Sequence, residues 1–215
     1  MDTPLKRPVP QPTPGFARRA GELRASLQQI SAELLALRTG SVLATSEAGN
    51  TEFHLSLFAA PVFGTFPELT FFSATGSELP DFQQLLLLYY FATADGTPVT
   101  GKWVSFADLP SGRMYAQAFQ GYSGDEIVKA FGEGLASFTD ACQKAGGQLA
   151  DAGDAAFIFQ ALPQVSVMMT YWLGDEDFPS SCKILFDANA THYLPIDGCA
   201  IIGSTLVKKI LKLKV

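Results

Sequence analysis

The spacing of apolar residues predicts two helices in the first half of the chain. From about residue 15 to 38, apolar residues recur at alternating steps of four and three, which is the heptad pattern of a helix with one apolar seam. From about 80 to 93 the chain is apolar on nearly every side, which is typical of a helix buried in a core. The heptad positions are Phe16, Ala20, Leu23, Leu27, Ile30, Leu34 and Leu37.

Two more helices are predicted in the second half. The one at about 123–145 has Ser123 and Glu126 in the spacing of a capping box, one apolar face, and a glycine pair after its end. The one at about 195–212 has a proline in its first turn and lysines in its last turn, and both residue types are favoured at those helix ends.

Short apolar or alternating runs bounded by glycine, proline or acidic residues predict strands. Three runs fall between residues 41 and 74, and three fall between 155 and 187. The last two flank the acidic segment DEDFPSS, which predicts an antiparallel hairpin with that segment in its loop. Residues 99–119, rich in glycine and aromatic side chains, are expected to form a loop or a short pair of strands. The runs are SVLATS, EFHLSLFA, ELTFFSA, AAFIFQALP, QVSVMMTYWLG and CKILFD.

These elements predict an α+β fold in which a mostly antiparallel sheet is packed by about four helices. The length of 215 residues and the apolar fraction of 47% suit one domain with a sizeable core, which we place at residues 15–215. Residues 1–14 contain five prolines and are expected to form a flexible tail, because proline disfavours both helix and strand ladder.

The charge of the chain argues against binding to nucleic acid. The formal net charge is −6, and the nearest basic cluster is a set of lysines at the end of the last predicted helix, where they complement the helix dipole. The longest apolar stretch, residues 85–92, is far shorter than the roughly 18 residues of a membrane span. We therefore expect a cytoplasmic protein that binds neither nucleic acid nor membrane. The lysines are Lys208, Lys209, Lys212 and Lys214.

The cysteines show no pattern of a cofactor site. Cys142, Cys182 and Cys199 are separated by 40 and 17 residues, which matches no C-x-x-C pair, zinc site or iron–sulfur segment. Each lies among apolar neighbours, so we expect thiols that serve as small core residues in a reducing compartment. No cofactor and no iron–sulfur cluster is predicted in the chain.

Acidic residues gather near the end of the chain, and two interpretations of them are open. In one, they hold a divalent metal, because hard cations bind several oxygen ligands from neighbouring loops. In the other, they are hydrated loop residues and helix caps that stabilise the backbone. The spacing matches no EF-hand or H-E-x-x-H motif, which favours the structural interpretation. The candidate metal ligands are Asp175, Glu176, Asp177, Asp187 and His192.

Two segments of the chain resemble an uncharacterised prokaryotic family known only as a domain of unknown function. They are LLLLYYFATADGTPVTGKWVSFADLPSGRMYAQAF and GDEDFPSSCKILFDANATHYLPIDGCAIIG, and the resemblance extends over about residues 30–210. Members of this family occur largely in anaerobes. Some are fused to, or named after, an iron–sulfur segment of the corrinoid-protein type.

The resemblance implies a context and no particular activity. It implies the cytoplasm of an anaerobe, near cofactor or one-carbon metabolism, with a corrinoid or iron–sulfur protein as a partner. Relatives often carry a histidine where this chain has Tyr89, and the four-cysteine segment of the fused relatives is missing here. The resemblance therefore implies no cluster in this chain.

The positions that carry the resemblance also suggest a ligand cleft. Aromatic rings would form its floor, and Arg113 would hold a carboxylate or phosphate. Alternatively, the rings form a second small core over the sheet. The cleft candidates are Trp103, Phe106, Arg113, Tyr115, Phe119 and Trp172.

Three functional hypotheses follow. The first is a non-catalytic module that binds a ligand or a partner and serves cofactor or one-carbon metabolism. The second is a metal-assisted hydrolase or transferase that uses the acids between residues 175 and 197. The third is a self-associating scaffold that dimerises through the heptad helix at residues 16–37.

Overall fold

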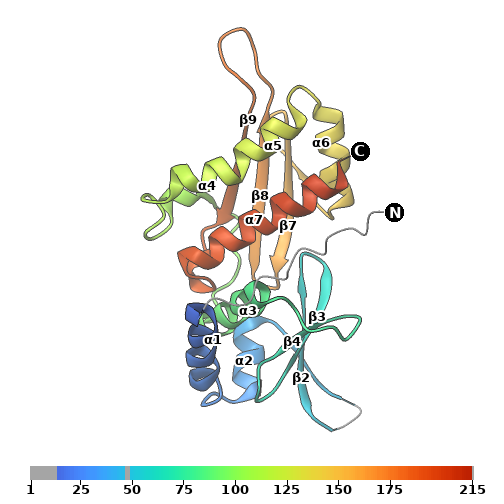
Figure 1. The fold of residues 1–215 in the computed structure, drawn as a ribbon. Helices are drawn as coiled ribbons and strands as arrows, with labels where there is room; N and C mark the ends of the chain where they lie inside the picture. The colour runs from blue at the N-terminus through green and yellow to red at the C-terminus, as the bar shows by residue number, and fades with distance from the viewer. Residues whose placement is uncertain (1–13, 47–48, 215) are drawn as a thin grey trace, which may run out of the picture.

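A computed structural model describes residues 14–46 and 49–214, so almost all of the predicted proline-rich tail lies outside the described residues. Within them the strands form two antiparallel sheets, each accompanied by helices, and the fold is α+β as predicted. Figure 1 shows the smaller sheet beside the N-terminal helices and the larger sheet behind the C-terminal helices. The prediction of one sheet is therefore wrong.

The smaller sheet is a four-stranded meander of β1 (Val42–Thr45), β2 (Thr51–Leu57), β3 (Ala60–Thr65) and β4 (Phe71–Ser73), paired in that order. The sequence pattern predicts the first, second and fourth strands. It misses β3, because this segment carries the proline and glycine that normally mark a connection.

Helices α1 (Pro14–Leu27) and α2 (Ala32–Thr39) replace the single heptad helix. The helix is interrupted where Ser31 caps α2, its side-chain oxygen accepting a hydrogen bond from the Leu34 N–H at 3.3 Å. The first half of the heptad stripe is buried in the core of the chain itself, whereas Leu37 in the second half is 78% exposed. The prediction of one continuous helix over residues 15–38 is therefore wrong, and dimerisation through residues 16–37 stays a prediction.

The larger sheet has the strand order β5-β9-β8-β7-β6. The predicted hairpin is confirmed, because β8 pairs antiparallel with β9 and the acidic segment lies in the loop between them. This loop projects beyond the rest of the molecule (Figure 1). The strands are β5 (Trp103–Ser105), β6 (Gln148–Ala150), β7 (Ala155–Leu162), β8 (Val165–Trp172) and β9 (Ser181–Asp187).

The helix predicted at 123–145 is divided in two, because Gly132 takes a positive φ of 50° at the break. The predicted capping box is also wrong, because the Ser123 hydroxyl donates to the Phe119 carbonyl at 2.5 Å instead of capping a helix. The last predicted helix is confirmed. The helices here are α4 (Ala116–Tyr122), α5 (Gly124–Phe131), α6 (Leu135–Lys144) and α7 (Ile196–Leu213), with short 3-10 turns η1 (Phe106–Asp108) and η2 (Ala190–His192).

Helix α3 (Asp81–Thr93) joins the two parts of the fold and is buried as predicted. It contacts α1 and α2 on one side and α7 on the other. The Phe91 ring centroid lies 4.9 Å from that of Phe53 in the smaller sheet. One contiguous cluster of buried apolar side chains runs through both sheets.

The side chains of Cys142, Cys182 and Cys199 are all buried in this core. Burial raises the pKa of each thiol, which keeps it protonated and unreactive, as expected from their apolar neighbours. None of the helices in the described part of the chain has the length and apolar character needed to cross a membrane.

Candidate functional site

Asp187, one of the candidate metal ligands, ends β9 and is completely buried. Its carboxylate accepts hydrogen bonds from the Thr100 N–H and hydroxyl, from the Gly101 N–H at 2.6 Å and from the Asn189 N–H at 3.0 Å. Burial alone would raise its pKa, but these hydrogen bonds outweigh the burial and lower it. Because a carboxylate has about four lone-pair sites, the oxygens of Asp187 are already used by the chain itself.

Further hydrogen bonds fasten the turn after β9 to the loop that follows α3 and to the β7–β8 turn. The Tyr193 hydroxyl donates to the Thr97 carbonyl at 2.6 Å, and the Asn189 amide donates to the Gln164 carbonyl at 3.0 Å. Among buried side-chain atoms of the described residues, Asn189 Oδ1 is the one acceptor that lacks a partner. We call these contacts between residues 97–101 and residues 187–193 the Asp187 junction. Nearly all of its polar groups form hydrogen bonds that connect these two segments of the backbone.

His192, another candidate metal ligand, forms a half-exposed pair with Asp95. Its Nδ1 lies 2.7 Å from Asp95 Oδ2 and 3.2 Å from Thr97 Oγ1. An Asp–His pair can orient a base, but the neighbouring hydroxyl lies on the same ring nitrogen as the carboxylate and not on Nε2, where a nucleophile would have to lie. The pair fastens the end of α3 to η2.

We expect Asp95 to ionise far below the usual range of a carboxyl group. Hydrogen bonds from His192 and Thr97 lower the pKa of Asp95 to about 2. The unfolded value is about 3.9, so the stabilisation from this carboxylate is complete above that pH and is lost as the pH falls towards 2. Carbon-13 chemical shifts of the carboxyl group across the acidic range measure this pKa. In His192→Ala the pKa should rise towards the ordinary value, and an unchanged pKa would contradict the assignment.

The remaining candidate metal ligands do not join Asp187. Asp175, Glu176 and Asp177 are exposed in the β8–β9 loop, at the opposite end of β9. A strand of this length separates the two ends by roughly 20 Å. Nowhere in residues 14–46 and 49–214 do three or more histidine, cysteine or acidic side chains come together in a group that could hold a metal ion. The interpretation of these acids as one metal site requires them to converge, and the structure does not bring them together.

The aromatic cleft candidates are also separated. Trp103 pairs with Asp187 at one end of β9, and Trp172 pairs with Ser181 at the other end. Phe106 and Phe119 are buried and stack with their ring centroids 4.1 Å apart. Arg113 and Tyr115 lie exposed between η1 and α4. The stacked rings thus form a small core, which is the alternative interpretation, and the six cleft candidates do not line one cleft.

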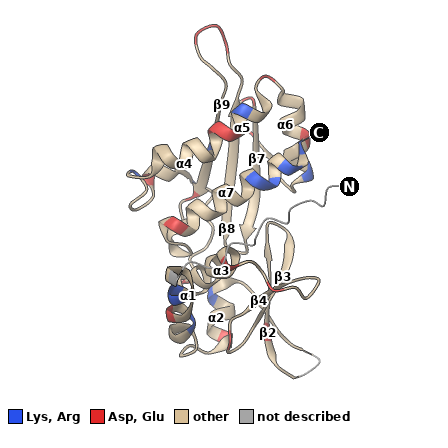
Figure 2. Ribbon diagram, in the orientation of Figure 1, with Lys and Arg blue, Asp and Glu red and all other residues tan. Residues whose placement is uncertain are grey.

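The structure instead brings cations together around a hollow beside the second half of α7. We call this feature the lysine-rimmed hollow; its volume is about 420 Å³. Figure 2 shows basic residues gathered on the C-terminal half of α7. Lys144 comes from α6 and two residues come from the start of α3, so three helices build it. It is lined by Phe82, Gln83, Lys144, Thr205, Lys208, Lys209, Lys212 and Leu213.

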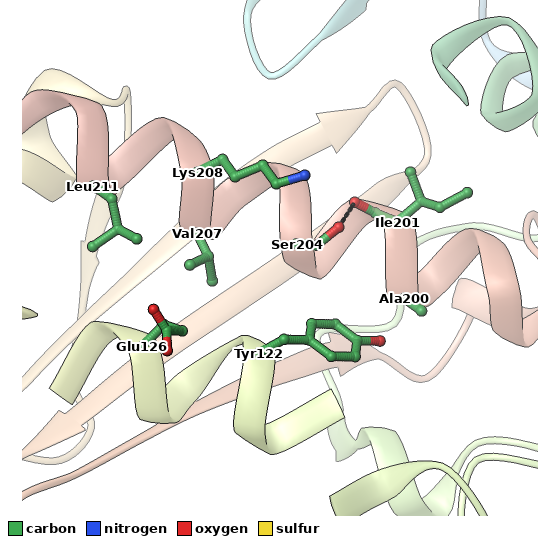
Figure 3. Close-up of a pocket in the computed structure, with 8 residues that line it drawn as sticks. All are labelled: Tyr122, Glu126, Ala200, Ile201, Ser204, Val207, Lys208 and Leu211. Atoms are coloured by element: carbon green, nitrogen blue, oxygen red, sulfur yellow. Dashed lines mark hydrogen bonds between the residues drawn. The ribbon is translucent and has the colours of Figure 1, made fainter. Parts of the chain in front are cut away.

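On the other side of the exposed ridge of α7 lies a second depression, the apolar groove, of about 450 Å³. Figure 3 shows Val207 and Leu211 of α7 pointing towards Tyr122 and Glu126, which lie on α4 and α5. Lys208 lies on its upper rim and belongs to both depressions. The groove is lined by Tyr122, Glu126, Ala200, Ile201, Ser204, Val207, Lys208 and Leu211.

The lysines of α7 are evident in the sequence, but the hollow is not. Their favourable interaction with the helix dipole is a sufficient local explanation for lysines at a helix end. The missing information is the contact of α7 with α3 and α6, which brings Phe82 and Lys144 to the same place. The spacing of Lys208, Lys209 and Lys212 on one side of a helix was the available signal.

The chain was compared with protein families, curated proteins and solved structures. A family model described as Domain of unknown function (DUF3786) matches residues 35–209. No curated protein and no solved structure matches. The matched range includes α3, the Asp187 junction, Lys208 and Lys209, and it ends within α7 before Lys212.

Proposed function

The chain belongs to the DUF3786 family, and from this premise we propose that it is a non-catalytic module that binds a small anionic ligand in the lysine-rimmed hollow. The observation that carries the proposal is that Lys144, Lys208, Lys209 and Lys212 surround one hollow in a chain whose net charge is −6. Like charges repel, so four amines around one depression favour the binding of an anion between them.

Two of the four amines already have a hydrogen-bond partner in the chain, and two do not. Lys144 lies 2.7 Å from Asp140 of its own helix, and Lys209 donates to the Phe58 carbonyl at 2.7 Å. Lys208 and Lys212 are exposed and form no hydrogen bond or ion pair with the described residues. The free pair therefore supplies the charge that an entering ligand would neutralise.

Chemistry and size define the class of ligand. Lysine ammonium groups act as point charges, so they select negative charge more than the planar shape that arginine recognises. Phe82, which is 41% exposed, and Leu213 add apolar contact beside the amines. Small-molecule sites span about 300–1,000 Å³, a range that includes this hollow. The proposed ligand is thus a carboxylate or phosphate with an apolar part.

The proposal places no catalytic group in this module. Asp187 and His192 are engaged in holding the backbone, and they lie in a different part of the fold from the hollow. Binding without chemistry requires only charge, shape and apolar contact.

The wider context of the proposal comes from the resemblance described above. We propose that the module works in the cytoplasm of an anaerobic prokaryote, in cofactor or one-carbon metabolism, with a corrinoid or iron–sulfur protein as its partner. A titration of the purified chain with such a protein, followed by analytical ultracentrifugation, tests the partner separately from the small ligand.

We expect Lys208→Ala/Lys212→Ala to weaken the binding of methyl phosphate by about tenfold or more, because each lost charge–charge contact is worth roughly 1 kcal/mol at an exposed site. Affinity is measured by NMR titration of the full chain at low ionic strength. Added salt should weaken binding to the wild type, since salt screens exposed charges.

The matched control is Lys102→Ala/Lys183→Ala, which removes the same number of charges from exposed positions that do not line the hollow. This variant should bind methyl phosphate almost as tightly as the wild type. An equal loss in both double variants would mean that only the overall charge matters, and the proposed site would be abandoned.

A further inference from the structure

We infer that the ligand of the lysine-rimmed hollow carries an elongated aliphatic chain, which crosses the ridge of α7 and lies in the apolar groove. This inference rests on the proposed function and extends it from a small anion to a particular class, an amphipathic molecule with an anionic head. It adds the groove residues to the binding site.

The two depressions are neighbouring parts of one surface of α7. Ser204, Val207 and Leu211 follow the helical spacing on the groove side, while Thr205, Lys209 and Lys212 follow it on the hollow side. Lys208 lies between the two rows and lines both depressions. In Figure 3 its side chain extends along the helix above Ser204, and the groove opens below it. A ligand whose head contacts Lys208 is therefore already at the edge of the groove.

The charges of the two depressions fix the direction of the ligand. Glu126 lies in the groove and repels an anionic head, and the apolar surface of Tyr122, Val207 and Leu211 suits an aliphatic chain. The hollow on the other side of the ridge carries the amines. The head thus belongs at the lysines and the chain belongs in the groove.

A small amphipathic molecule fits this division better than a helix of a partner protein. A helix with its side chains is about 10–12 Å wide and would cover the ridge of α7 together with its exposed lysines. The groove and the hollow each have a volume typical of a small-molecule site, and they differ in charge. One molecule with two chemically distinct ends satisfies both.

The test is a series of alkyl phosphates (methyl, butyl and octyl) titrated into the full chain below their micellar concentrations. Burial of aliphatic carbon should tighten binding by about two- to fourfold for each added methylene until the groove is filled. In methyl-detected NMR, octyl phosphate should shift the Val207 and Leu211 methyl signals, and methyl phosphate should leave them unchanged.

A variant with a filled groove tests whether the aliphatic chain lies there. Ala200→Phe places a ring where the aliphatic chain would lie, and Ala200 is half-buried at the groove and lies away from the amines. It should abolish the gain with chain length and leave the affinity for methyl phosphate unchanged. Thermal unfolding of this variant confirms that it is folded.

The outcomes separate the two ideas. If methyl phosphate binds at the lysines but the affinity does not grow with chain length, the inference is wrong and the proposed function stands. If the affinity grows with chain length and Ala200→Phe retains the whole gain, the chain lies elsewhere and the inference is again wrong. If methyl phosphate does not bind, the proposed function fails first.

Discussion

We expect Asp187→Ala to lower the free energy of unfolding by about 2–4 kcal/mol. The substitution removes the buried acceptor shared by Thr100, Gly101 and Asn189. The donor of Asn189 is left unpaired in a buried position, whereas Thr100 and Gly101 are exposed residues whose donors water can partly satisfy. Each unpaired buried donor costs about 1–3 kcal/mol, although relaxation of the loop recovers part of the sum. Urea unfolding followed by circular dichroism measures the difference.

The role of Asp187 can also be tested by measuring how the free energy of unfolding changes as the pH falls. The pKa of Asp187 is lowered on folding, so its stabilisation is present above the unfolded pKa of about 3.9 and is lost as the pH falls below it. Asp187→Ala should therefore lose less stability than the wild type on acidification. The control is Asp177→Ala, an exposed acid of the β8–β9 loop, which should change stability by no more than about 0.5 kcal/mol. Equal small losses in both variants would contradict the role assigned to Asp187.

We expect Gly124→Ala to lower the free energy of unfolding by about 3 kcal/mol, at the upper end of the range for an overpacked core. A methyl group at Gly124 would lie 2.1 Å from the Cys182 carbonyl oxygen of β9, far inside contact distance. The obstacle is the backbone of β9, which is paired with β8 at Cys182, so α5 must move away from β9. Because α5 forms one wall of the apolar groove, the variant should also bind octyl phosphate less tightly.

A neighbouring glycine provides a control of opposite sign. Gly121 lies in α4, and a methyl group there would meet no atom within 4 Å. Alanine favours a helix over glycine by up to about 1 kcal/mol, so Gly121→Ala should be neutral or stabilising. If the two variants unfold at the same denaturant concentration, the close contact between α5 and β9 is not present.

The sequence pattern predicted those helices and strands that depend only on residues close together in the chain. The apolar run of α3, the β8–β9 hairpin around its acidic loop, and α7 with its proline and lysines all follow from neighbouring residues. In two places the sequence pattern predicted one long helix where the structure has two, because a strong apolar pattern continued across a helix end. The heptad spacing concealed the cap at Ser31, and the apolar face after Ser123 concealed the break at Gly132.

The candidate site depends on contacts between distant parts of the chain, and here the sequence was insufficient. The interpretation of the acids as groups that stabilise the backbone agrees with the hydrogen bond from the Asn189 N–H to Asp187, two residues away. Its bonds to Thr100 and Gly101 span 87 and 86 residues and have no local pattern. The lysine-rimmed hollow likewise forms only when the tertiary fold brings Phe82 and Lys144 to α7.

The most direct test of the proposed function is the location of anion binding in solution. Backbone amide NMR spectra of the full chain are recorded during a titration with methyl phosphate. The proposed site predicts that the largest shifts belong to the residues that line the hollow, all saturating with one dissociation constant. These residues are Phe82, Gln83, Lys144, Thr205, Lys208, Lys209, Lys212 and Leu213. Saturating shifts centred on another part of the chain, or no saturable shifts at all, would contradict it.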